Sequence, residues 1–397
     1  MLNETVERTH LKPIKKMQRY PSKTREALAR TAFILLAGTT LMAQNSPQST
    51  ASEASHVQKA KSTPLLTAEL KAGLGYKDNV LESENNREGA AFALGQFDMA
   101  LKPEEIPLSL RVMGEERRFV DAQLLREEQA FEAEGVYSPV APDQWHTTLT
   151  GLYHFDNGVE DVSDEQVGVS SAKVKGHEFT GMAEVERELG DSVTVSLEPF
   201  ITRQTWSAIL DDYLQYGATL RTEWESTDAT KFSLRYQARN RDYDNRTQAD
   251  ALGNSLVGSS LTYLNQDVTA QCRHYWDEAH RWQTRLRLGT AWNTDNGSGY
   301  YDYQRYQVSS QLRYAGKEWQ FDFGYRYNFT DYSSQPANGT QGTTYHRSGG
   351  AVTSAVAWNF REDWNLSLEY EWERVDSNRA ADDYTVNTVS LGLSYAF

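Results

Sequence analysis

A stretch near the C-terminal end constrains the fold of this chain more than any other feature. From Glu318 to Phe329 the sequence reads EWQFDFGYRYNF, with an aromatic residue at almost every second position. The intervening positions carry Gln, Asp, Gly, Arg and Asn. Successive side chains of a β-strand point to opposite faces, so this alternation predicts a strand with one aromatic and one polar face.

Two environments suit such a strand. In a soluble sandwich the apolar face packs inward, whereas in a membrane barrel it meets lipid and the polar face lines a lumen. One strand does not decide between them, but the pattern recurs from Leu65 to Phe397. We predict an all-β, antiparallel up-and-down transmembrane barrel of about sixteen strands. The expected strands are 65–77, 89–101, 105–117, 124–137, 144–155, 175–187, 191–203, 213–224, 231–242, 260–275, 281–292, 304–314, 318–329, 347–360, 364–375 and 386–397.

Three of these segments depart from simple alternation. The phase shifts between Leu94 and Phe97, and again between Tyr263 and Val268, which we interpret as β-bulges. Residues 124–137 also fit a helical period, and a helix there would lower the strand count.

Composition favours the barrel over other membrane and soluble classes. The chain is 39% hydrophobic, its mean hydropathy is −0.67, and it holds no run of about 18 apolar residues that could cross a bilayer as a helix. Its single cysteine excludes a disulfide framework within the chain. A net charge of −15 predicts no binding to nucleic acid.

The N-terminal region has the features of an export signal. Residues 1–30 are basic and Thr31–Ala43 is a short apolar run, so residues 1–43 are predicted to be a secretory signal peptide. The alternative is a buried helix of a cytosolic domain. Residues 44–63 are small and polar, which predicts a disordered periplasmic lead-in before a barrel of residues 64–397.

The connections between the expected strands alternate in length. Those at 102–104, 188–190, 225–230, 315–317 and 361–363 are short, whereas those at 78–88, 156–174, 243–259, 293–303 and 330–346 are long and rich in Asn, Asp, Gly and Ser. Short periplasmic turns opposite long external loops are typical of barrels in the bacterial outer membrane. An even strand number then places both ends of the barrel in the periplasm.

Aromatic residues recur at a spacing that matches a bilayer. Trp282 and Trp292 share one face ten residues apart, as do Trp319 and Phe329. Ten residues at about 3.3 Å and a tilt near 45° span roughly 23 Å, close to the apolar band of about 25 Å in such barrels. The predicted membrane-interface aromatics, which would contact outer-membrane lipid and lipopolysaccharide, are Trp145, Trp282, Trp292, Trp319, Phe329, Trp364 and Trp372.

Two motifs resemble known features of bacterial outer-membrane proteins. The ending VSLGLSYAF, with apolar Tyr395 and terminal Phe397, resembles the assembly signal read by the barrel-assembly machinery. The stretch with Gly73, Gly75, Tyr76 and the sequence Asp78-Asn79-Val80 resembles the end of the first strand in the β-barrel porin 2 family. That resemblance implies an association with surface polysaccharide systems.

Charged residues on the expected inner faces define a candidate solute pathway. Its proposed residues are Arg221, Arg235, Arg239, Arg285, Arg287, Arg313, Arg326, Glu369 and Glu371; Arg241 and Arg305 share the phase of these arginines, and Glu69, Glu115, Glu132, Glu184 and Glu198 add to the acids. The arginines cluster on the eighth to thirteenth strands and the acids mostly elsewhere. Such a wall attracts anions. The alternative is that these charges form ion pairs that stiffen the barrel.

Other chemistry finds little support in the sequence. His146 and His154 share a face but would lie about 26 Å apart along a strand, and the chain has no Gly-x-Ser-x-Gly. Residues 293–303 lack the spacing and closing Glu of a calcium loop. We therefore expect no enzyme activity, no metal and no cofactor. The expected function is a porin-like channel for small solutes; a surface scaffold barrel and a barrel serving polysaccharide export are the alternatives, and the oligomeric state stays open.

Overall fold

The computed structural model describes residues 66–84, 87–103, 106–123, 125–139, 145–161, 171–207, 210–337 and 342–397. The predicted signal peptide and lead-in lie outside these ranges. Sixteen strands and one short 3-10 helix, Ala380–Asp382, account for most of the described residues. The strands are β1 (Leu66–Lys77), β2 (Ala90–Leu101), β3 (Leu108–Val120), β4 (Glu127–Tyr137), β5 (Trp145–Asp161), β6 (Ser171–Leu189), β7 (Val193–Trp206), β8 (Tyr213–Thr227), β9 (Thr230–Tyr243), β10 (Thr262–Tyr275), β11 (Trp282–Asp295), β12 (Tyr303–Ala315), β13 (Trp319–Pro336), β14 (Thr344–Arg361), β15 (Trp364–Ser377) and β16 (Tyr384–Ala396).

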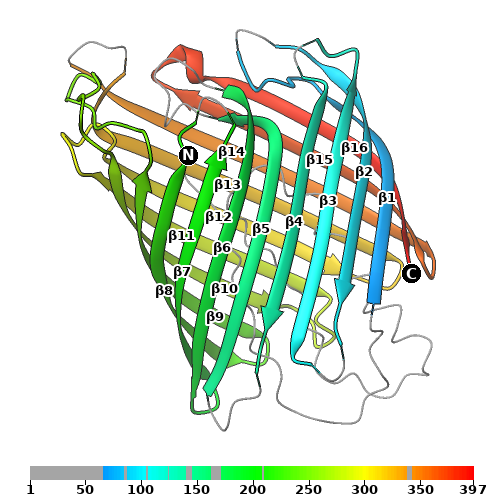
Figure 1. Ribbon diagram of the computed structural model, residues 1–397. Helices are drawn as coiled ribbons and strands as arrows, with labels where there is room; N and C mark the ends of the chain where they lie inside the picture. Colours follow the sequence, from blue (N-terminus) through cyan, green and yellow to red (C-terminus); the bar gives the residue numbers. More distant parts are fainter. Residues whose placement is uncertain are drawn as a thin grey trace.

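The sixteen strands form one closed antiparallel barrel in which each strand pairs with its neighbours in sequence (Figure 1). β1 closes the cylinder against β16, with Glu69 opposite Ala396 at one end and Lys77 opposite Thr388 at the other. Closure leaves no strand edge unpaired, which is what a sheet requires in hydrocarbon. The predicted fold class is confirmed. Residues 127–137 form strand β4, so the helical alternative for this segment is wrong.

The two expected bulges are absent. β2 pairs with β1 and β3, and β10 with β9 and β11, in unbroken register. The apparent phase shifts arise because Phe92, Leu94 and Tyr263 are apolar residues on the inner face, where they are buried. Register shifts occur elsewhere, at the ends of β8, β13 and β14.

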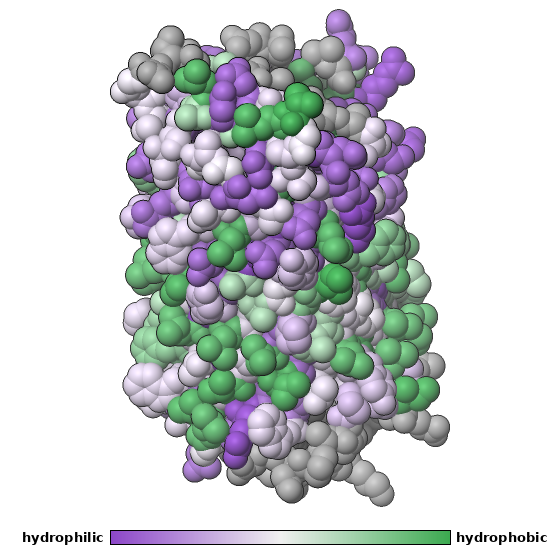
Figure 2. All heavy atoms as spheres, turned by 60° about the vertical axis from the view of Figure 1, so that its left-hand side comes forward, coloured by the Kyte–Doolittle hydropathy of each residue, from purple (hydrophilic) through white to green (hydrophobic). Residues whose placement is uncertain are grey.

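The two ends of the barrel differ. β2 and β4 finish at the lower end in Figure 1, where the described connections include the short turns after β6, β8, β12 and β14. The other end carries the loop of residues 244–261, which packs on its neighbour because Gln248 Nε2 donates to Asn296 O at 3.2 Å and Ser298 Oγ donates to Ala249 O at 2.8 Å. Figure 2 shows hydrophobic residues gathered over the lower part of the barrel and hydrophilic residues dominating the upper part. The bilayer therefore surrounds the short-turn end, and the upper part projects beyond it.

The apolar face of each strand points outward. Phe323, Tyr325 and Leu391 are 38%, 39% and 52% exposed, although they are among the most apolar residues of their strands. In the intervening positions Gln320, Asp322 and Ser390 are buried. A sandwich with a dry, aromatic centre is thereby excluded, because its burial pattern would be the reverse. Within the described ranges, no helix has the length and hydropathy needed to span a membrane.

Candidate functional site

The inner face of the barrel is largely polar and charged, although a cluster that includes Phe92 and Leu94 is apolar. The alternation of burial places every predicted pathway residue on this face, opposite exposed apolar neighbours. Arg239, Arg285 and Arg313 are buried there, while Glu369 and Glu371 line a small cavity together with Arg117, Asp322 and Ser390. The structure thus brings the proposed residues to one lumen, and their role in solute passage remains a prediction.

The separation of charge around the lumen is only partial. On the basic arc, Arg235 Nη2 lies 3.0 Å from Asp267 Oδ1, and Arg221 pairs with Glu223 on its own strand. On the acidic arc, Lys71 Nζ lies 2.5 Å from Glu369 Oε1. The ion-pair interpretation therefore applies to these residues, and the expected arrangement, with the arginines on one arc and most acids elsewhere, stays a prediction. Sequence alternation identifies the face of a residue but not its cross-strand partner.

Some arginines of the basic arc also form hydrogen bonds with neutral groups. Arg239 Nη1 donates to Gln237 Oε1 at 2.9 Å, and Arg305 Nε donates to Thr330 Oγ1 at 2.8 Å. A neutral acceptor satisfies a guanidinium N–H without cancelling its charge. These two contacts therefore leave the guanidinium charge in place.

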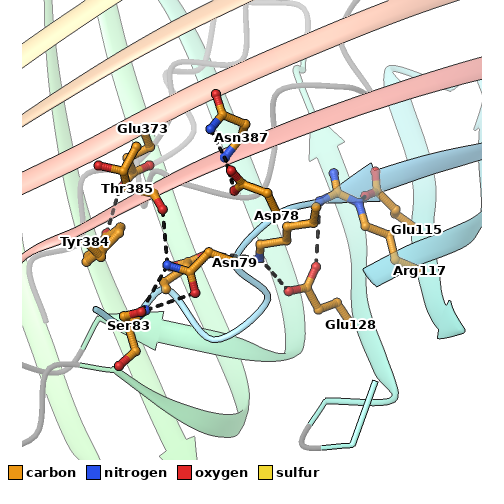
Figure 3. A network of polar contacts seen from close by, with 12 residues as sticks. Asp78, Asn79, Ser83, Glu115, Arg117, Glu128, Glu373, Tyr384, Thr385 and Asn387 are labelled. Atoms are coloured by element: carbon orange, nitrogen blue, oxygen red, sulfur yellow. Dashed lines mark hydrogen bonds and ion pairs between the residues drawn. The ribbon is translucent and has the colours of Figure 1, made fainter. Parts of the chain in front are cut away.

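A buried ionic network lies at the upper end of the lumen (Figure 3). Lys77 Nζ donates to Glu82 Oε1 and to Glu128 Oε1, both at 2.9 Å. Arg117 continues the network, with Nε 2.8 Å from Glu115 Oε1 and Nη1 3.7 Å from Glu128 Oε2. Burial raises the pKa of Glu82, which lies in the β1–β2 loop, to about 8. Two carboxylates share one ammonium group, so Glu82 retains its proton near neutral pH.

The motif that resembles the β-barrel porin 2 family closes the barrel at the β1–β16 seam. Asp78 accepts hydrogen bonds from the Asn387 N–H at 2.7 Å and from Asn387 Nδ2 at 2.8 Å (Figure 3). Although partial burial opposes the effect, these bonds and Arg87 lower the pKa of Asp78. Asn79 Nδ2 donates to Thr385 O at 3.1 Å, and Val80 is fully buried. The motif thus connects the β1–β2 loop to β16 by hydrogen bonds.

Aromatic side chains line the upper rim of the lumen, a feature that the sequence analysis missed. They are the buried tyrosines Tyr213, Tyr243, Tyr263, Tyr303, Tyr332, Tyr345 and Tyr384. Arg241 lies over the Tyr213 ring at 4.2 Å and Arg379 over the Tyr345 ring at 3.9 Å. These tyrosines occupy the same alternate positions as the polar residues of their strands, and this alternation could have predicted that they face inward.

The predicted interface aromatics lie on the outer face. Trp145, Trp282 and Trp319 are 47%, 40% and 51% exposed and begin their strands at the short-turn end. Other aromatic rings contact these residues at the same end of the barrel. Trp319 stacks on Trp358, and Trp282 contacts Tyr314. Trp364 contacts Tyr395, which in turn stacks on Phe397. Trp292, Phe329 and Trp372 lie further along their strands toward the loop end. Amphipathic rings at such positions suit a membrane–water interface.

Groups able to hold a metal are not evident. Within the described ranges, no cluster of three or more His, Cys, Asp or Glu side chains is placed to bind an ion. His146 and His154 share the inner face of β5, as predicted, and His154 Nδ1 lies 3.9 Å from Glu132 Oε2.

A closed sixteen-strand cylinder with an exposed apolar exterior and a charged interior is a transmembrane β-barrel of the bacterial outer-membrane class. Comparisons with solved structures return barrels of the same kind. OccAB4 of Acinetobacter baumannii shares 9% identity over 84% of this chain and 98% of its own, with a TM-score of 0.46. A BenF-like porin from Pseudomonas fluorescens Pf-5 shares 12% identity over 84% and 99%, with a TM-score of 0.44. A bacterial polysaccharide outer membrane secretin shares 8% identity over 83% and 98%, with a TM-score of 0.41. Neither a family model nor a curated protein matches the sequence.

Proposed function

We propose that this protein is a porin-like channel of the outer membrane, without catalytic activity, that passes small solutes passively and favours anions. The observation that carries the proposal is the largely polar and charged inner face of a closed sixteen-strand barrel. Barrels of sixteen to eighteen strands are wide enough to enclose an aqueous channel. The last strand, ending at Tyr395 and Phe397, would be the signal for insertion by the barrel-assembly machinery.

The preference for anions rests on the wall formed by β9 to β12. Arg239 and Arg305 are bonded to neutral side chains, and Arg287 Nη2 donates to Gln271 Oε1 at 3.3 Å. Arg285 is one further inner-face arginine of this wall, two residues from Arg287 on β11. Fixed positive charge inside a narrow low-dielectric cylinder raises the local concentration of anions and lowers that of cations.

Planar-bilayer recordings test both parts of the proposal. Wild-type protein in a KCl gradient should conduct, with a reversal potential on the anion-selective side. The double variant Arg285→Ala/Arg287→Ala should shift that potential toward cation selectivity. A matched control, Arg187→Ala/Arg361→Ala, removes two exposed arginines near the short-turn end and should leave the potential unchanged.

The outcomes separate the alternatives. Absence of any conductance in correctly folded barrels contradicts the channel and favours the surface scaffold. Conductance with the same reversal potential in wild type and the Arg285→Ala/Arg287→Ala variant contradicts the anion preference alone.

A further inference from the structure

Positive side chains face one another across three neighbouring strands near the short-turn end of the lumen. In the register of the sheet, Lys231 on β9 lies directly opposite Arg273 on β10, and Arg273 lies directly opposite Arg285 on β11. All three occupy inner-face positions. Like charges directly opposite each other in a sheet repel, so such a row is unfavourable unless a counter-charge is present.

A fourth positive group extends this basic row. Arg313 on β12 is opposite Gln283, whereas Arg285 is opposite Gln311 two positions away. Arg313 is therefore the diagonal neighbour of Arg285, at a separation of about 7–8 Å between backbones. Arg313 is 6% exposed. Three guanidinium groups thus converge from three consecutive strands.

The described part of the chain supplies too little negative charge for this cluster. Glu223 is engaged by both Arg221 and Lys231. Asp322, opposite Arg313, also accepts two hydrogen bonds from Gln311 Nε2, at 2.8 and 3.1 Å, and its single charge offsets one of the three guanidinium charges. Arg273 forms no ion pair with any carboxylate among the described residues. Its nearest register partners are both cationic.

Several nitrogen atoms of the cluster are also unused. Within the described residues, Arg273 Nε and the Arg313 Nε and Nη2 atoms are buried and have no hydrogen-bond partner. A buried charged donor left unsatisfied is costly, so native structures normally provide an acceptor for it. The described residues supply no acceptor for these atoms, so the cluster has donors to offer a small anion. Arg273 as a whole is only half-buried, so the lumen offers access to the cluster.

We infer that Arg273, Arg285 and Arg313 form a binding site for a small divalent oxyanion with tetrahedral oxygens, such as sulfate or phosphate. Guanidinium groups present planar pairs of N–H donors that match such oxygens, and they keep their charge at any physiological pH. A dianion neutralises two of the three positive charges at once, which a chloride ion does not. The inference deepens the proposed function, because this site would select among the anions that the channel admits.

Isothermal titration calorimetry of the folded, detergent-solubilised barrel with sodium sulfate tests this site directly. Wild type should show saturable binding that persists in excess sodium chloride. The variant Arg273→Gln/Arg313→Gln should bind sulfate at least about tenfold more weakly, because it loses two charge-assisted contacts. The control Arg187→Gln/Arg361→Gln carries the same change in net charge on the outer surface and should bind as wild type does.

Folding is checked for every variant by heat modifiability on gels, and Arg273→Lys/Arg313→Lys provides a second, charge-conserving pair. The lysine pair should recover part of the affinity. Equal sulfate affinity in wild type and Arg273→Gln/Arg313→Gln, or no binding by wild type, overturns the site. Calorimetry does not depend on conductance, so the two proposals can fail separately. Sulfate binding by a non-conducting barrel would contradict only the channel proposal. A conducting barrel that binds no sulfate would contradict only the proposed anion site.

Discussion

Replacement of Lys77 by methionine would remove the cation that bonds both Glu82 and Glu128 in the upper network. Lys77 Nζ lies 2.9 Å from an oxygen of each of Glu82 and Glu128, and the three side chains are 4%, 1% and 2% exposed. Methionine has nearly the same length but no charge. The variant therefore deletes an ion pair and a hydrogen bond while keeping the packing volume.

The expected loss in free energy of unfolding depends on the buried carboxylate that remains after Lys77 is replaced. At an effective dielectric constant near 20, opposite unit charges 2.9 Å apart attract by about 6 kcal/mol, part of which offsets their desolvation. Because Glu82 holds a proton near neutral pH, the carboxylate that loses its close partner would be Glu128, which keeps the longer contact of 3.7 Å to Arg117 Nη1. Removing one partner of a buried pair generally costs about 3–5 kcal/mol, and we expect a loss of free energy of unfolding in that range.

Guanidinium-induced unfolding of the refolded barrel, followed by tryptophan fluorescence, measures this loss. The control is Arg87→Gln, whose ion pair with Asp78 is 3.0 Å long but whose side chain is 53% exposed, so it should cost no more than about 1 kcal/mol. The double variant Lys77→Met/Glu128→Gln should recover most of the stability, since it removes the stranded charge. The reasoning is refuted if Lys77→Met costs no more than Arg87→Gln, or if the double variant is as unstable as Lys77→Met alone.

Two further perturbations probe the seam and the same network. A β-carbon on Gly75 would lie 2.5 Å from Val389 O, so Gly75→Val should prevent closure of β1 on β16 and abolish the heat-modifiable folded band on gels. The control Gly95→Val, where an added β-carbon would have nothing within 4 Å, should fold normally. Equal folding yields for the two variants would contradict the steric argument. The pKa of Glu82 is about 8 when folded and near 4.5 in its ordinary state, so the folded barrel binds more protons between these values and its stability should fall as pH rises from about 5 to 8 and then level off. The difference in unfolding midpoint between Glu82→Gln and wild type should therefore be larger at pH 9 than at pH 6; parallel curves across this range would show that Glu82 does not titrate as argued.

The sequence predicted most of the fold because the alternation that defines a strand is local. Alternate apolar residues such as Phe323, Tyr325 and Leu391 indicate the apolar face of a strand from its own sequence. All sixteen strands were predicted, with their ends displaced by several positions. The same alternation assigned Arg239, Arg285 and Glu371 to the inner face correctly. It failed at Phe92, Leu94 and Tyr263, where apolar residues face inward, because the period alone does not distinguish an apolar side chain that packs inside the barrel from one that contacts lipid.

What the sequence by itself determined is therefore the direction of each side chain, inward or outward, since that depends only on a repeat of two residues. The tertiary structure decided which inward charges meet. The pairing of Lys77 with Glu128, 51 positions away, and the meeting of Arg273 with Arg285 depend on register between strands and on closure of the cylinder. Register is fixed by hydrogen bonds between separate segments, and no local pattern in either segment records the other's position.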